Sequence, residues 1–245
     1  LSNCIALICR KCKIIKCFIN VLLSIFTINE NNVNQANDQL KQWKSNNIIL
    51  YLTQTARIIL FYFTLQKQES QDTQQIDANI VILALIAIKD SCTPRKTERI
   101  EQIREIWTAT NKEATAMRET VRSAISQSIF HSYEPIRSLA CAALSYVLQI
   151  EGTNWISIIP QIINNPIQSD PLNIISIFAF WEIFELHVIP VHIHFTSLDK
   201  NDFVKLVTNI FNIVTNQDDS IGSNIKEKSF QCLKHLISIL GPAFF

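Results

Sequence analysis

The sequence is poor in glycine, and this scarcity excludes several large classes of protein. Only 3 of its 245 residues are glycine, where average usage of roughly 7% would give about 17. Sheet-rich proteins need glycine at many turns with a positive φ, so a fold built on strands is not expected. Gly152, Gly222 and Gly241 are too far apart to form a GxGxxG or GxxxxGK[ST] loop. Rossmann enzymes, P-loop NTPases and protein kinases are therefore excluded.

The chain also lacks an excess of charge of either sign. Lys plus Arg number 22 and Asp plus Glu number 21, which gives a formal net charge of +1. This balance argues against a surface devoted to nucleic acid, and we expect no nucleic-acid partner. One local basic cluster alternates with glutamates, which predicts an exposed, salt-bridged helix face. It comprises Arg95, Lys96, Arg99 and Arg104, interleaved with Glu98, Glu101 and Glu105.

Long apolar runs are missing as well. Charged residues interrupt the apolar first 28 residues between Arg10 and Lys16, and the longest mainly apolar stretch, 18–26, is far shorter than the roughly 20 residues of a membrane span. We therefore expect no membrane insertion. A signal peptide is an alternative for this region, although no small-residue cleavage site precedes Asn29. Residues 1–28 stay an unassigned apolar and basic segment, and because Met117 is the sole methionine we expect the chain to be a fragment.

Two groups of metal-ligating residue types occur, and neither has a spacing typical of a metal site. Four cysteines could close a tetrahedral zinc site, but one CxxC without a distant second pair is a weak match. Three histidines near two glutamates leave a zinc-dependent hydrolase open as an alternative, although no HExxH motif is present. The two groups are Cys4, Cys9, Cys12 and Cys17, and His187, His192 and His194 with Glu182 and Glu185.

Catalytic signals are absent too. The sequence has no nucleophile elbow and no plausible order of Ser, His and Asp for a triad. Its seven cysteines are spread along the chain, which predicts reduced thiols rather than a disulfide framework. We therefore expect no enzymatic activity, no metal and no cofactor.

Helical periodicity is the main signal that the sequence does contain. Within 111–130, one stripe of small and apolar residues runs from Ala114 to Ser128, and similar stripes occur in 202–215 and 224–240. In 224–240 the expected buried stripe includes Phe230, Leu236 and Ile237. Further helices are expected at 30–45, 47–66, 75–90, 95–107, 135–150, 155–164 and 172–187. Pro94, Pro135 and Pro171 stand where a helix would start.

The predicted class is all-α. Helices at 30–45, 75–90, 135–150, 172–187 and 224–240 recur at intervals that average near the 40 to 47 residues typical of HEAT and armadillo repeats. Short connections between successive helices favour antiparallel pairs that bury their apolar faces against neighbouring pairs. We predict an α-α superhelix, a HEAT/armadillo-type solenoid of about five helical pairs, with 95–107 as an insertion.

Residues 82–92 form an apolar helical pattern that is followed by a polar loop and Glu105-Ile106-Trp107. This motif resembles the N-terminal portion of importin-β, a karyopherin, in which an apolar helix ends in a Lys-Asn pair before an insertion and a tryptophan. Asp90 stands where the family usually has asparagine. Residues 138–144 and 154–162 resemble the small-residue helix of the third repeat and the start of the fourth. The resemblance covers about residues 29–240, so 29–245 are assigned to a HEAT-repeat array cut from a longer solenoid.

The resemblance implies a nuclear transport receptor that binds Ran in its GTP form. Binding would use the second helix of each pair on the concave side, here 30–45, 75–90 and 135–150. Lys89, Asp90 and Trp107 match positions of the family motif and are nominated as Ran-binding residues.

The same resemblance implies further partners and a location. Phe-Gly nucleoporins would bind on the convex side, and importin-α or cargo would bind through repeats absent from this chain. The protein would work in cytoplasm and nucleus, at the nuclear envelope and pore. The alternatives are an exportin-type karyopherin, an unrelated HEAT-repeat scaffold, and the histidine-based hydrolase.

Overall fold

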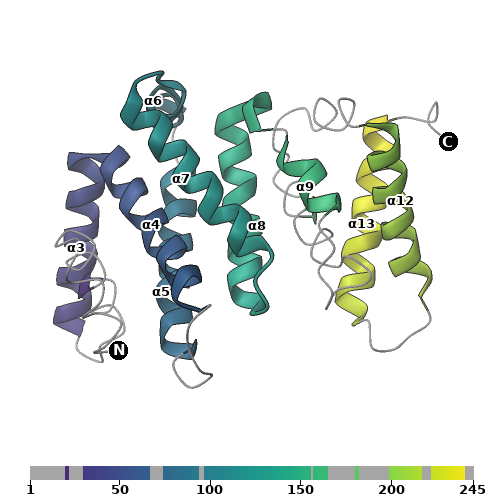
Figure 1. Cartoon of the computed structure of the whole chain (residues 1–245), viewed down its shortest axis with the longest axis horizontal. Coiled ribbons are helices and arrows are strands. Elements are labelled where there is room, and N and C mark those ends of the chain that lie inside the picture. Colours follow the sequence, from purple (N-terminus) through teal and green to yellow (C-terminus); the bar gives the residue numbers. More distant parts are fainter. Residues whose placement is uncertain are drawn as a thin grey trace. The chain divides into compact units, whose positions relative to one another are not determined.

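The computed structural model describes residues 20–21, 30–66, 74–93, 97–155, 157–164, 180–181, 199–216 and 222–240 (Figure 1). In these ranges all regular secondary structure is helical, and none of it is strand. The chain divides into two compact units, Leu1–Ser128 and Ile129–Phe245, and each is described by itself. The predicted all-α class is therefore confirmed for the part of the chain that the structure describes.

The first unit is built from α3 (Glu30–Asn46), α4 (Ile48–Gln66), α5 (Gln74–Cys92), α6 (Thr97–Thr108) and α7 (Lys112–Ile129). Helices α4 and α5 pack side by side, and α3 packs against α4 (Figure 1). A single residue separates α3 from α4. That residue, Asn47, caps α4, because its Oδ1 accepts a hydrogen bond from the backbone N–H of Leu50 at 2.9 Å.

Burial explains why α4 and α5 form the centre of this unit. On α5 the buried apolar positions recur at helical spacing, with Val81, Ala84, Leu85, Ile88 and Cys92 all inside. Helix α4 supplies the facing layer through one buried apolar face, which includes Leu52, Ala56 and Ile59. Full burial of one such leucine or isoleucine contributes about 1.5–3 kcal/mol, so this helix pair carries much of the unit's stability.

Helices α6 and α7 are joined by a short polar connection. Asn111 caps α7, because its Oδ1 accepts from the backbone N–H of Ala114 at 2.8 Å. The guanidinium of Arg118 donates to the carbonyl oxygens of Trp107 and Ala109 and to Oγ1 of Thr115. These bonds satisfy carbonyls at the C-terminal end of α6, which would otherwise lack helical partners. The predicted stripe of α7 is confirmed, since its members, Ala114, Met117, Val121, Ala124 and Ser128, are buried.

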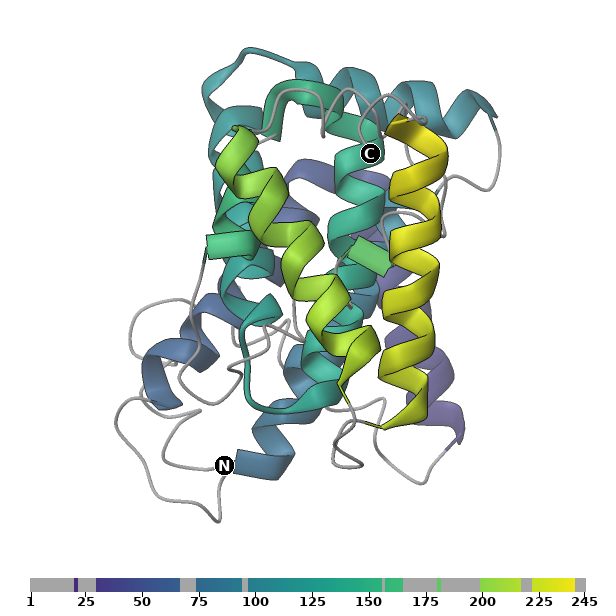
Figure 2. The ribbon, with the colours of Figure 1, turned by 90° about the vertical axis from the view of Figure 1, so that its right-hand side faces the viewer.

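The second unit contains α8 (Glu134–Glu151), the 3₁₀ turn η2 (Gly152–Trp155), α9 (Ile158–Asn164), α12 (Lys200–Thr215) and α13 (Ser223–Leu240). Pro135 lies in the first turn of α8, as predicted. Figure 2 shows α12 in light green and α13 in yellow lying antiparallel and side by side. Asn164 fastens α9 to α12 through hydrogen bonds with Asp202 at 2.6 Å and Lys205 at 2.8 Å.

The prediction of a continuous helix at 155–164 is wrong for the first residues of that range. The chain there forms η2 and then a shorter α9 that begins at Ile158. Gly152, with φ 61°, ends α8 in a backbone conformation that other residues rarely adopt. Pro160 explains the late start of α9, since a proline has no N–H and is tolerated only in the first turn of a helix.

The buried stripe expected on α13 is also partly wrong. Phe230 and Ile237 are exposed, whereas Ser229, Cys232 and Leu236 are buried. The exposed pair and the buried triplet both fit a 3.6-residue period, so the periodicity predicts the helix but leaves open which face is buried. Helix α13 packs against α12, and its buried face carries Ser229 and Cys232.

Some predicted features lie outside the described residues. These are most of segment 1–28 and the helix expected at 172–187, of which only Phe180 and Trp181 are described and are helical. Nζ of Lys228 lies 4.2 Å from the centre of the Trp181 ring, which is a cation–π contact. Among the helices described, none combines the length and the apolar character that crossing a membrane requires.

Candidate partner-binding groove

The three residues nominated as Ran contacts lie in different surroundings within the first unit. Lys89 and Asp90 belong to the last turn of α5, where Lys89 is half-buried and Asp90 is exposed. Trp107, near the end of α6, is only 1% exposed. Lys89 and Asp90 are thus accessible to a partner, and the indole of Trp107 is not.

The placement of Trp107 corrects its nomination as a contact residue. Its side chain is buried in the core, and its carbonyl oxygen accepts a hydrogen bond from Arg118 on α7. A large ring that is buried in this way stabilises helix packing through the area it removes from water. We therefore assign Trp107 a structural role in holding α6.

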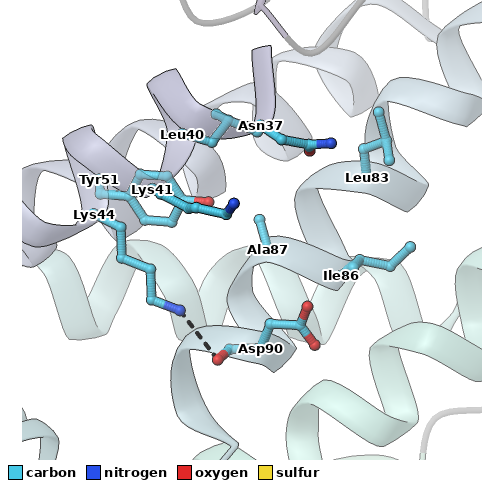
Figure 3. Close-up of a pocket in the computed structure, with 9 residues that line it drawn as sticks. All are labelled: Asn37, Leu40, Lys41, Lys44, Tyr51, Leu83, Ile86, Ala87 and Asp90. Carbon is cyan, nitrogen blue, oxygen red and sulfur yellow. Dashed lines mark hydrogen bonds between the residues drawn. The ribbon is translucent and has the colours of Figure 1, made fainter. Parts of the chain in front are cut away.

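A groove lies between α3 and α5, with one residue of α4 at its base (Figure 3). We call it the α3–α5 groove, and it encloses about 240 Å³. Its lining is Asn37, Leu40, Lys41, Lys44, Tyr51, Leu83, Ile86, Ala87 and Asp90. Asp90 is the one nominated residue that contributes to it.

Helical spacing explains why these residues share the groove. The lining residues of α3 follow one another at steps of three, one and three along the chain, and those of α5 do the same from Leu83 to Asp90. Residues three and four apart lie on the same face of a helix, so each helix presents one stripe to the groove. The stripe of α3 is rich in lysine, and that of α5 is apolar until Asp90.

Lys44 joins the two walls of the groove. Its Nζ donates a hydrogen bond of 3.1 Å to the backbone oxygen of Asp90 (Figure 3). That oxygen belongs to the last turn of α5, where carbonyls lack helical partners and the helix dipole favours a positive charge. The contact fixes α3 against the C-terminal end of α5 across 46 residues of sequence.

Tyr51 supplies a polar atom at the base of the groove. Burial, and secondarily the negative charge of Asp90, raise the pKa of Tyr51 from its ordinary value near 10 to about 12. Both causes disfavour the phenolate, because it would be a charge placed in a poorly hydrated site near another anion. The phenol therefore stays protonated throughout the physiological range and can donate a hydrogen bond.

Lys41 is the most accessible cation of the groove. Figure 3 shows its side chain extending from α3 toward α5. Its Nζ lies 3.2 Å from Oδ1 of Asp38, and the two side chains are 78% and 75% exposed. An exposed pair of this kind contributes roughly 0–1 kcal/mol, so Lys41 can exchange Asp38 for a carboxylate of a partner at little cost.

The groove combines charged, polar and apolar side chains. Among the described residues no cluster of three or more His, Cys, Asp or Glu side chains is placed to hold a metal ion. The groove offers two lysines, the carboxylate of Asp90, a phenol and an apolar wall, which suit hydrogen bonding and contact with a partner's side chains. Of the groove residues, the sequence motif predicts Asp90 and does not predict Lys41, Lys44 or Tyr51. The two lysines have a sequence signal, which is their spacing on one face of α3, and Tyr51 has none.

The two alternative metal sites lie outside the described residues. Cys4, Cys9, Cys12 and Cys17 are not described, and neither are His187, His192 and His194. The described cysteines, Cys92, Cys141 and Cys232, are free and buried. Of the basic cluster, Arg104 is described as exposed, together with Glu101 and Glu105, and these three form no ion pair with one another. The exposed face is confirmed for them, and the salt bridging expected between them is not observed.

No protein-family model and no curated protein matches the chain. Among solved structures, a chain from a structure of Kap95p with RanGDP matches with a TM-score of 0.60 at 13% sequence identity. The match covers 90% of this chain and 29% of that one, so this chain spans less than a third of its neighbour's length. That structure describes Kap95p as inducing the switch loops of RanGDP to adopt the GTP-bound conformation.

A designed armadillo repeat protein in complex with the peptide (KR)4 also matches. It has a TM-score of 0.28 at 11% identity, over 92% of this chain and 94% of that one, which is too low to establish a common fold. The likeness to the Kap95p structure establishes the fold alone: the chain is an all-α helical-repeat protein of the HEAT/armadillo type, similar in fold to a karyopherin.

Proposed function

We propose that this chain is the Ran-binding HEAT portion of a nuclear transport receptor, and that it contributes to protein import into the nucleus. The observation that carries the proposal is the likeness in fold to a chain solved in a structure of Kap95p with RanGDP. The importin-β-like motifs around Asp90 and Trp155 support it independently of the fold.

The proposed Ran-binding surface in the first unit is formed by α3 and α5. These are second helices of their pairs in the importin-β resemblance, and the α3–α5 groove lies between them. Lys89 and Asp90 stand at the end of α5, where Asp90 is exposed. Adjacent second helices of a solenoid form a continuous surface that contacts a globular partner over a large area. In the second unit, α8 is proposed as a further contact.

Phe-Gly nucleoporins are the second class of partner proposed. We place importin-α or cargo on repeats beyond this chain, and the site of action in cytoplasm, nucleus and nuclear pore. An exportin would share the Ran-binding module and differ in its cargo, so Ran binding alone does not separate the two karyopherin classes.

The test is equilibrium binding of the chain to Ran loaded with a non-hydrolysable GTP analogue and, in parallel, with GDP. We expect clear preference for the GTP form, with residual GDP binding because the Kap95p structure contains RanGDP. The double variant Lys89→Ala/Asp90→Ala should weaken binding, whereas Lys234→Ala, on exposed surface of α13, should not. A folded, helical protein that binds neither form would leave an unrelated HEAT scaffold as the function.

A further inference from the structure

The α3–α5 groove is smaller than an ordinary small-molecule site. Pockets for free ligands span roughly 300–1,000 Å³, and this groove encloses about 240 Å³. An apolar cavity of about 150 Å³ holds a single benzene ring. The volume therefore suits one large side chain of a macromolecular partner rather than a complete free ligand.

The two walls of the groove differ in chemistry. The wall of α5 presents Leu83, Ile86 and Ala87, and the wall of α3 presents the stems and ammonium groups of Lys41 and Lys44. Lys44 is directed to the backbone oxygen of Asp90, whereas Lys41 reaches over the groove (Figure 3). The ammonium of Lys41 forms an ion pair with the exposed Asp38. An occupant thus meets an apolar surface on one side and a cation on the other.

The length of the groove limits the occupant further. From Asn37 to Lys44 the lining of α3 rises about 10 Å along the helix axis, at 1.5 Å per residue. An extended chain covers this distance with about three residues. The site therefore fits a short segment and not a whole helix.

We propose that the α3–α5 groove is a docking site for a short acidic segment of a protein partner, with one large apolar side chain. The apolar side chain packs against Leu83, Ile86 and Ala87, and an adjacent carboxylate pairs with Lys41. Charge complementarity favours this occupant, because the lining carries two lysines against the single carboxylate of Asp90, and a basic segment would bring like charges against Lys41 and Lys44. The proposal rests on the proposed function, which makes Ran the partner that carries the segment.

Two variants test the groove without altering the rest of the fold. Lys41→Glu reverses the accessible cation on a side chain that is 78% exposed, and Ala87→Phe fills the apolar half. Lys234→Glu makes the same charge change on the exposed surface of α13 and serves as the matched control. Far-UV circular dichroism checks that each variant keeps its helix content. If the Ala87→Phe variant does not fold, the binding of the Lys41→Glu variant alone tests the docking site.

Binding of these variants to Ran with the GTP analogue is the first measurement. We expect about fivefold weaker binding for Lys41→Glu, about tenfold weaker binding for Ala87→Phe, and no change for Lys234→Glu. If both groove variants bind Ran as the unmodified chain does, the docking site is overturned while the proposed function stands.

A second probe keeps the two proposals separable. It is a blocked five-residue peptide with phenylalanine at its centre and two acidic residues on each side, followed by amide chemical shifts of the full chain. We expect shifts in 37–44 and 83–90 that disappear when the acidic residues are replaced by lysine. This result together with no Ran binding would retain the groove and refute the proposed function. Equal shifts from the lysine peptide, or none from the acidic one, would overturn the docking site.

Discussion

At the scale of single residues, burial separates structural roles from binding roles. Trp107 and Asp90 belong to the same family-like motif, yet one is enclosed and the other is exposed. Sequence alone cannot make this distinction, because a tryptophan in an apolar stripe and a tryptophan at a binding surface have the same spacing. Because the environments of these side chains differ, we expect their substitution to have different effects, which can be measured.

Replacing Trp107 should destabilise the protein strongly. Trp107→Ala removes a fully enclosed ring and leaves a cavity, so we expect a loss of about 3–5 kcal/mol in the free energy of unfolding. The matched change Phe211→Ala removes an aromatic ring that is 56% exposed, and should change stability by at most about 0.5 kcal/mol. Urea unfolding of both variants measures the difference. Equal effects would contradict the structural role assigned to Trp107.

Tyr51 should make stability depend on pH in the alkaline range. Its pKa in the folded protein is about 12, above the value near 10 expected in the unfolded chain. Its contribution to stability is therefore fully present below pH about 10 and is lost as the pH rises through about 12. Asp90→Asn should lower the pKa of Tyr51 and leave it above 10, because burial is the larger cause.

Phenolate absorbance during an alkaline titration measures this pKa, and subtraction of the Tyr51→Phe variant isolates the signal of Tyr51. Circular dichroism in the same titration shows whether the protein is still folded. Ionisation of Tyr51 near pH 10 in the folded protein would refute the buried, anion-adjacent position at the base of the groove.

At the scale of helices, the sequence predicts which helices exist better than it predicts how long each one is or which of its faces is buried. Nine of the ten expected helices have a counterpart among the described residues, with α9 shortened, and the tenth lies mostly outside them. Apolar periodicity and the prolines locate these helices, since both act within a single segment. The true buried face of α13 depends on packing against α12, and periodicity contains no information about that neighbour.

The groove was predictable only in part for the same reason. The motif on α5 predicts Asp90, but no motif predicts the wall that α3 contributes to the groove. Lys44 and Asp90 are 46 residues apart, and their contact depends on how α3 and α5 meet. Helical spacing places Lys41 and Lys44 on one face of α3 and does not name the helix they approach.

The break between α8 and α9 gives a prediction at this scale. Gly152 has φ 61° and ψ −128°, and its N–H bonds to the carbonyl of Leu148. Gly152→Ala should cost about 1–3 kcal/mol through backbone strain alone, because an added Cβ would meet no atom within 4 Å. Gly222→Ala is the matched control, since its site is equally open and shows no positive φ. Thermal or urea unfolding measures both variants. If their free energies of unfolding differ by less than about 0.5 kcal/mol, this explanation is contradicted.

At the scale of the whole molecule, the central claim is that a HEAT/armadillo-type fold here serves recognition of Ran. Fold alone does not imply function, since one architecture supports many partners. The α3–α5 groove and the exposed end of α5 give the claim a surface with named residues. The response to nucleotide state tests the whole proposed surface at once, so it is more informative than the effect of any one substitution.

Binding of the full chain to Ran in its two nucleotide states is the most direct test of that claim. Isothermal titration with Ran carrying the GTP analogue and with RanGDP, on a sample whose helical content is verified, gives both affinities. We predict clear preference for the GTP form, at least about tenfold, which corresponds to 1.4 kcal/mol. Equal affinity for the two forms, or no binding to either, would contradict the account.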